Sequence, residues 1–393
     1  MRKKPIGFFG GIICLILITG CDLQKSSTAR TFATHWSVKP SLKYDVCHLV
    51  GIMTGRPLYE KFYPEITQTW ARNLPAPVKT SIENIDKLLG PEWPPGPRLS
   101  LLMAAVPADD SLNAILQAIQ NNAQIYDRLM QSDYGSPRNW KQWVDLKPHV
   151  QTVLQYLIDK NFEEYWRSNL LPKITADVAV IQQDLQSYDV VGEIQNFLVD
   201  YQCPDTIDIY LLALAQPHEL RISSQQRATD IKNPLKATIR SFYQEILHPY
   251  CDRLIDSTLA ADFSNLQSDA FLLNTYSPVA ANGGQENLTA YFKKELVIAA
   301  ELWLSARRQL LTAQTNLQAE ETGELVRQYL RTKDNGIHVL AAVIYSYLES
   351  GLKLDRLSYA DFIKDLFASG RLKPGKIESR YRDFMNRPVA GSD

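Results

Sequence analysis

The chain of 393 residues has little of several things that define common protein classes. It has only six histidines, five cysteines and five methionines, and its formal net charge is −1 at pH 7. Because there is no basic surplus, we expect no nucleic-acid partner. The sequence also has no glycine-rich phosphate loop, no G-x-S-x-G nucleophile elbow, no dinucleotide-binding fingerprint and no internal repeat. These absences argue against nucleotide-dependent enzymes, α/β-hydrolases and solenoids.

The longest apolar run, residues 6–18, follows three basic residues and is too short for a confident membrane-spanning helix. It ends in Ile18-Thr19-Gly20-Cys21. This arrangement resembles the lipobox of bacterial lipoproteins, in which the cysteine is lipidated and becomes the new N-terminus. The resemblance implies a signal peptide over residues 1–20 and acyl chains such as palmitate on Cys21. The protein would then be lipid-anchored to the bacterial cell membrane, facing the periplasm or the exterior.

Three cysteines remain once the signal peptide is removed and Cys21 is lipidated. They are Cys47, Cys203 and Cys251. An odd number in an oxidising compartment allows one disulfide and one free thiol, and the sequence does not choose the pair. The polar residues 21–40 read as a tether between membrane and domain, and residues 388–393 as a tail.

Helical spacing of apolar residues dominates the rest of the chain, with one exception. Residues 206–212 are rich in β-branched and aromatic side chains, and residues 219–222 follow a turn, which predicts an antiparallel hairpin. The expected fold class is mainly α (α+β), with helical lobes around a small antiparallel β element. Residues 41–203 would form a helical N-terminal lobe, and residues 204–387 the hairpin and a second helical lobe.

The helix expected over residues 235–247 carries the most informative motif. It contains Gln244-Glu245-x-x-His248, which differs by one residue from the H-E-x-x-H zinc helix of metalloproteases. In such a helix, two histidines four residues apart face one metal ion, and the glutamate between them activates the metal-bound water.

A third ligand would have to come from a later helix. Glu295 lies within an apolar stripe on the helix expected over residues 287–318, and a buried carboxylate needs a metal, a positive charge or hydrogen-bond donors. Glu301 shares a helical face with Lys294 and Arg308, which predicts a solvated surface acid. On another apolar helix, His338 is expected to be a core histidine whose hydrogen bonds are satisfied.

Together, the hairpin, the Gln244–His248 helix and the later acid resemble the core of gluzincin metalloproteases. The similarity is to secreted bacterial proteins with a helical N-terminal half, and residues 44–63 add to it. The resemblance implies Glu245 as general base, His248 and Glu295 as metal ligands, and zinc as the cofactor of a functional site. Because Gln244 replaces the first histidine, it implies a groove that has lost proteolysis and binds a peptide or envelope protein without a cofactor.

Two alternatives stay open. The first is an active zinc-dependent peptidase in which Gln244 is tolerated, or in which Cys251, three residues after His248, serves as a ligand. The second is a structural helical envelope lipoprotein without a metal site, with Glu245 and His248 as ordinary residues near a helix end.

Overall fold

The computed structural model describes residues 34–281, 288–311, 322–350 and 357–387. The predicted signal peptide, Cys21, most of the tether and the tail lie outside these ranges. The described residues form one compact unit. Among its described helices, none is both long enough and apolar enough to cross a membrane.

A four-stranded mixed sheet lies at the centre of this unit, in the order β1-β2-β4-β3. Its strands are β1 (His35–Pro40), β2 (Thr206–Leu212), β3 (Leu220–Ser223) and β4 (Gln226–Asp230). Strand β2 pairs in parallel with both β1 and β4, and only β3 and β4 are antiparallel. The division predicted at Pro204 therefore runs through the sheet, because β1 comes from one side of it and β2 to β4 from the other.

Two predictions about this region were wrong in detail. The tether expected over residues 21–40 ends before His35, because Trp36 and Val38 alternate with more exposed neighbours and bury one face of β1. The strand expected over 206–212 does not pair with the one expected over 219–222. The hairpin joins β3 to β4, whose sequence Gln-Arg-Ala-Thr-Asp lacks the apolar alternation that signals a strand.

Helices account for most of the remaining chain, which confirms the mainly α (α+β) class. Those before the second strand are α1 (Leu42–Met53), α2 (Pro57–Phe62), α3 (Pro64–Ile66), α4 (Ala76–Leu89), α5 (Pro95–Met103), α6 (Leu112–Ala118), α7 (Asn122–Met130), α8 (Pro137–Asp159), α9 (Phe162–Tyr165), α10 (Leu171–Leu185) and α11 (Val190–Leu198), with π-helical turns η1 (Thr67–Ala71) and η2 (Trp166–Leu170).

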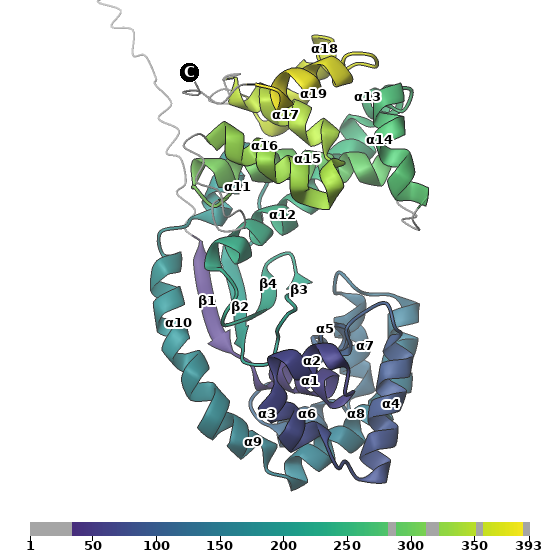
Figure 1. The fold of residues 1–393 in the computed structure, drawn as a ribbon, viewed down its shortest axis with the longest axis vertical. Helices are drawn as coiled ribbons and strands as arrows, with labels where there is room; N and C mark the ends of the chain where they lie inside the picture. The colour runs from purple at the N-terminus through teal and green to yellow at the C-terminus, as the bar shows by residue number, and fades with distance from the viewer. Residues whose placement is uncertain (1–33, 282–287, 312–321, 351–356, 388–393) are drawn as a thin grey trace, which may run out of the picture. The chain divides into compact units, whose positions relative to one another are not determined.

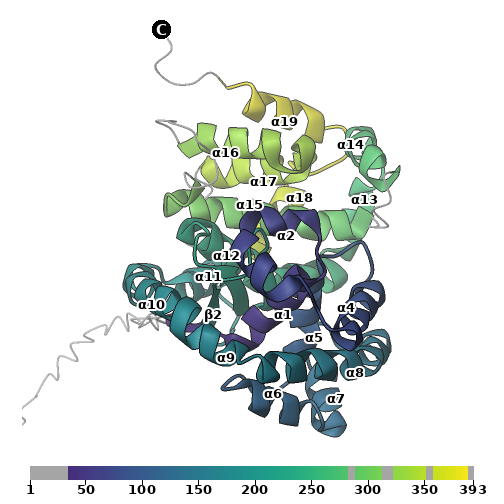
Figure 2. The same ribbon diagram turned by 60° about the horizontal axis from the view of Figure 1, so that its bottom comes forward.

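The helices after the sheet are α12 (Leu235–Arg253), α13 (Ala260–Leu266), α14 (Ala270–Ala281), α15 (Leu288–Arg307), α16 (Thr322–Thr332), α17 (Val339–Glu349), α18 (Tyr359–Ala368) and α19 (Ile377–Met385), with turns η3 (Leu254–Thr258) and η5 (Lys333–Gly336). Helix α10 runs along β1, as Figure 1 shows. Helix α15 packs on α12 and on α17, and Figure 2 shows α15, α16 and α17 together with α19.

The first helix is joined to the sheet by a buried carboxylate. Asp45 on α1 is fully buried, and its Oδ1 accepts hydrogen bonds from the backbone N–H groups of Ala213 (3.0 Å) and Leu214 (2.9 Å), just after β2. Its Oδ2 accepts one from the indole N–H of Trp166 at 2.7 Å. Three segments far apart in the sequence therefore meet at one side chain, and each donor would lose its partner without it.

Replacing this carboxylate should destabilise the whole unit. We expect Asp45→Ala to lower the free energy of unfolding by about 3–5 kcal/mol, because three N–H groups, two of them buried, lose their acceptor. Urea unfolding followed by tryptophan fluorescence measures the change. Asp383→Ala, on the exposed face of α19, is the matched control and should stay within about 0.5 kcal/mol of wild type. Equal stability of the two variants would contradict the role of Asp45.

The same residue should make stability depend on pH. Burial raises the pKa of Asp45 to about 7, although its three N–H donors act in the opposite direction. An unfolded Asp titrates near 4, so between about pH 4 and about pH 7 the folded state binds the extra proton and stability falls as pH rises.

Asp45→Asn removes this titration and tests it. Relative to the Asn variant, wild type should lose stability with a slope approaching about 1.4 kcal/mol per pH unit within that window. Burial also raises the pKa values of Asp109 and Asp230, but both are present in both proteins and cancel. Parallel stability curves for the two proteins, obtained by urea unfolding across the window, would show that Asp45 does not titrate there.

Candidate functional site

The predicted metal helix exists and is longer than expected. Helix α12 continues through Pro249 to Arg253. Ile239, Phe242 and Ile246 are buried, as their spacing predicts. Gln244, Glu245 and His248 are each only partly exposed, because the sheet and α15 flank this helix.

Glu295, the expected third ligand, is bonded to residues at the start of α17. Glu295 is fully buried on α15, and its Oε1 lies 2.6 Å from His338 Nδ1. Its Oε2 accepts a hydrogen bond from the backbone N–H of Ala341 at 2.8 Å. The second ring nitrogen of His338 lies 3.0 Å from Asp334 Oδ2, so the prediction of a satisfied core histidine is confirmed. Both carboxylate oxygens of Glu295 are thus used to join α15 to the start of α17.

The acid that Gln244 reaches is Glu301 instead. Glu301 is fully buried, so its prediction as a surface acid was wrong. Arg240 Nε lies 2.7 Å from Glu301 Oε1, and Arg240 Nη2 lies 3.1 Å from Oε2. Ser305 donates to Oε1 at 2.6 Å, and the Gln244 amide donates to Oε2 at 3.2 Å. The polar face of α15 is buried because Arg240, one helical turn before Gln244, supplies the opposite charge.

The expected general base is held by two arginines of the sheet. Glu245 Oε2 lies 2.8 Å from Arg221 Nε on β3, and Oε1 lies 3.5 Å from Arg227 Nη2 on β4. His248 has no hydrogen bond or ion pair with any described residue, and burial lowers its pKa, so its imidazole is neutral at pH 7. The acid of the motif therefore ties α12 to the β3–β4 hairpin.

These side chains do not fit a zinc ion. Within the four described ranges, no three His, Cys, Asp or Glu side chains converge as a metal-ligand group. Glu301 is already neutralised by Arg240, whose guanidinium would repel a cation bound at the same carboxylate. Cys251 is buried, which raises the pKa of its thiol and favours the protonated form, whereas metals bind the thiolate. No metal-dependent step can be derived from these residues.

The expected disulfide is not present. Cys47, Cys203 and Cys251 are all free thiols. Cys47 and Cys251 are fully enclosed by the core, so each is accommodated as a small apolar side chain.

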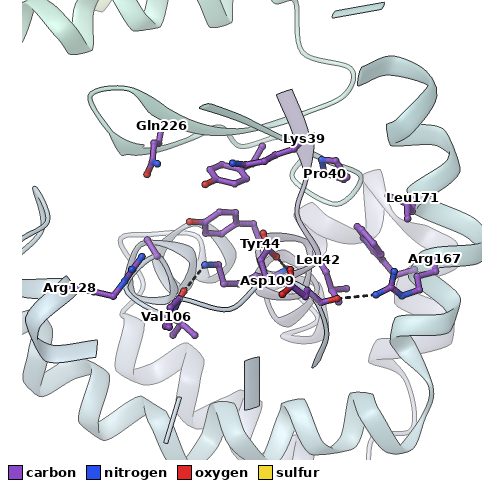
Figure 3. A pocket seen from close by; sticks show the side chains of 16 residues that line it. Lys39, Pro40, Leu42, Tyr44, Val106, Asp109, Arg128, Arg167, Leu171 and Gln226 are labelled. Carbon is purple, nitrogen blue, oxygen red and sulfur yellow. Dashed lines mark hydrogen bonds between the residues drawn. The ribbon is translucent and has the colours of Figure 1, made fainter. Parts of the chain in front are cut away.

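A second candidate site lies where β1 runs directly into α1. It is a cavity of about 510 Å³, with walls from the end of β1, the start of α1, β2, the loop after α5, α7 and the start of α10. Figure 3 shows Lys39 and Gln226 on the sheet side, with Tyr44, Asp109 and Arg128 facing them. Because these residues come from distant parts of the sequence, only the folded chain brings them together.

Much of the charge around this cavity is paired locally. Lys39 Nζ lies 3.0 Å from Asp208 Oδ1, and Arg167 lies 2.9 Å from Glu163. Asp109 serves as a cap for α1: its Oδ1 accepts from the backbone N–H of Lys43 at 2.8 Å and from the Ser41 hydroxyl at 3.0 Å. Two cations, Lys43 and Arg128, line the cavity without a carboxylate partner within 4 Å among the described residues.

Sequence reasoning missed both Glu301 and the cavity, for different reasons. Arg240 was a usable signal for Glu301, since a cation one turn before Gln244 on a buried helix requires an acid opposite. No sequence pattern predicts the cavity, because neither Lys43 nor Arg128 belongs to a motif.

Comparisons with protein-family models, with curated proteins and with solved structures found no match. The resemblance to the gluzincin core therefore stays a prediction.

Restoring the missing histidine tests the relation between this helix and a zinc site. We expect Gln244→His to bind zinc no more tightly than wild type, because Arg240 continues to occupy Glu301. Isothermal titration of both proteins with zinc chloride measures this. A stoichiometric zinc site that appears in Gln244→His and disappears in the double variant with His248→Ala would contradict the expectation and support gluzincin ancestry.

Proposed function

We propose that the chain is a lipid-anchored protein of the bacterial envelope that binds a ligand without cleaving it. The lipobox-like Ile18-Thr19-Gly20-Cys21 supports attachment to the membrane through Cys21. The ion pairs of Glu245 and Glu301 support the absence of zinc-dependent proteolysis, because both acids are committed to structural contacts.

The cavity at the β1–α1 junction is the single observation that supports a binding role. Its volume of about 510 Å³ falls within the roughly 300–1,000 Å³ range of small-molecule sites. Its lining combines tyrosines and aliphatic side chains with lysines and arginines, so it offers apolar surface together with a few directional polar groups.

The location is tested by lipid labelling of the full chain in a bacterial host. Wild type should incorporate labelled palmitate and sediment with membranes. Cys21→Ser should lose the label, because the lipidated sulfur is removed. Cys14→Ser is the matched control, since Cys14 belongs to the predicted signal peptide and should leave labelling intact. Labelling that survives in Cys21→Ser would overturn the lipid anchor.

A further inference from the structure

The cavity at the β1–α1 junction contains three polar groups that form no ion pair with any described residue. Lys43 is only 7% exposed, and its Nζ donates to the backbone carbonyl of Val106 at 2.8 Å. Arg128, on α7, makes no ion pair or hydrogen bond with the part of the chain that the structure describes. Tyr44 is 3% exposed, and no described residue hydrogen-bonds its hydroxyl.

The charged side chains around this cavity lie close enough to affect one another. Burial is the main cause that lowers the pKa of Lys43; the charge of Asp109 acts to raise it, and the charges of Arg128 and Lys39 act to lower it. Three cations are thus close enough to repel one another. The Lys43 ammonium also lies 5.0 Å from the centre of the Tyr44 ring. Figure 3 shows the Tyr44 side chain between Gln226 on one side and Arg128 on the other.

The nearby acids offset this charge only in part: Asp109 acts to raise the pKa of Lys43, but no described acid forms an ion pair within 4 Å of Lys43 or Arg128. Asp109 lines the cavity, but its Oδ1 is bonded to the first turn of α1. Asp110 also lines it and is exposed to solvent. Lys39 and Arg167 have their own acidic partners, so Lys43 and Arg128 are the cations of the cavity that form no ion pair with a described acid.

We propose that this cavity binds the phosphate monoester group of a small molecule, with Arg128 and Lys43 supplying charge and the Tyr44 hydroxyl donating a hydrogen bond. A phosphate monoester carries about −1.5 to −2 charges at pH 7, which matches two cations, whereas a carboxylate would offset only one. The cavity is larger than a phosphate ion needs, and Pro40, Pro107 and Leu171 supply apolar surface for the organic part. The ligand is therefore a phosphorylated organic molecule rather than inorganic phosphate.

This inference rests on the proposed binding role and names its ligand class. The same chemistry has two sources at a membrane: a soluble phosphate ester, or the headgroup of phosphatidic acid. The experiment uses the full lipidated chain in phosphatidylcholine nanodiscs, titrated with glycerol 3-phosphate by calorimetry. A second arm measures capture of vesicles of phosphatidylcholine with and without phosphatidic acid.

Arg128→Gln is the decisive variant, because the side chain is exposed on α7 and its replacement should not disturb folding. We expect its Kd for the phosphate ester to rise at least about tenfold, as for a lost charge-assisted contact. Tyr44→Phe removes only the hydroxyl and should weaken binding about fivefold. Arg138→Gln, an exposed arginine outside the cavity, is the matched control and should stay within about twofold of wild type.

The two arms of the experiment distinguish a soluble phosphate ester from a lipid headgroup. Binding of glycerol 3-phosphate that depends on Arg128 supports a soluble ligand, and Arg128-dependent capture of phosphatidic acid vesicles alone supports a lipid headgroup. If neither binds, or if Arg128→Gln binds as tightly as Arg138→Gln, the ligand class is wrong. Palmitate labelling at Cys21 is measured separately, so a failure here leaves the lipid anchor standing.

Discussion

The buried carboxylate of Asp45 is the constraint on which the central part of this structure depends. It holds the first helix against the exit of β2 and against the indole of Trp166. Its neighbours in the sequence are Tyr44 and, one residue earlier, Lys43. Because α1 cannot rotate or slide without losing three hydrogen bonds, two of them buried, those two side chains are kept at the cavity. The contact that stabilises the fold therefore also positions the candidate site.

The buried ion pair of Arg240 and Glu301 places a fixed cation where a zinc helix would hold its metal ion. A carboxylate facing Gln244 across α12 and α15 has to be neutralised, either by a metal ion or by a fixed cation. Here Arg240 supplies that charge from the same helix, with two short contacts to Glu301. Burying two charges is costly unless they are paired and hydrogen-bonded, and Ser305 and Gln244 complete the bonding of Glu301. Glutamine suits that position because its amide donates to a carboxylate, which a metal-binding imidazole nitrogen would not do.

Periodicity in the sequence was enough to predict the helical class and the buried face of α12, because Ile239, Phe242 and Ile246 repeat at helical spacing. It failed where a strand is short or polar. The alternation of Trp36 and Val38 spans only part of β1, and β4 shows none because its buried side chains are mostly polar. Glu295 and Glu301 were assigned opposite environments from one helical wheel, yet both are fully buried. A wheel identifies faces but not which partner helix covers each face, and α15 is covered by α12 on one side and α17 on the other.

The parallel pairing of β1 with β2 also decides where ligand-binding chemistry can arise. Parallel strands need a long connection, and here residues 41–205 supply it with a whole group of helices. That connection begins at the cavity with α1 and returns to it with α10, so its loops and helix ends line the same space as the sheet. Burial and the charge of Arg128 lower the pKa of Lys43, Asp109 acts in the opposite direction, and Arg128 has no ion pair among the described residues. An anion bound between these two cations would reduce their repulsion. We therefore place the proposed function at the β1–α1 cavity rather than at the Gln244–His248 helix.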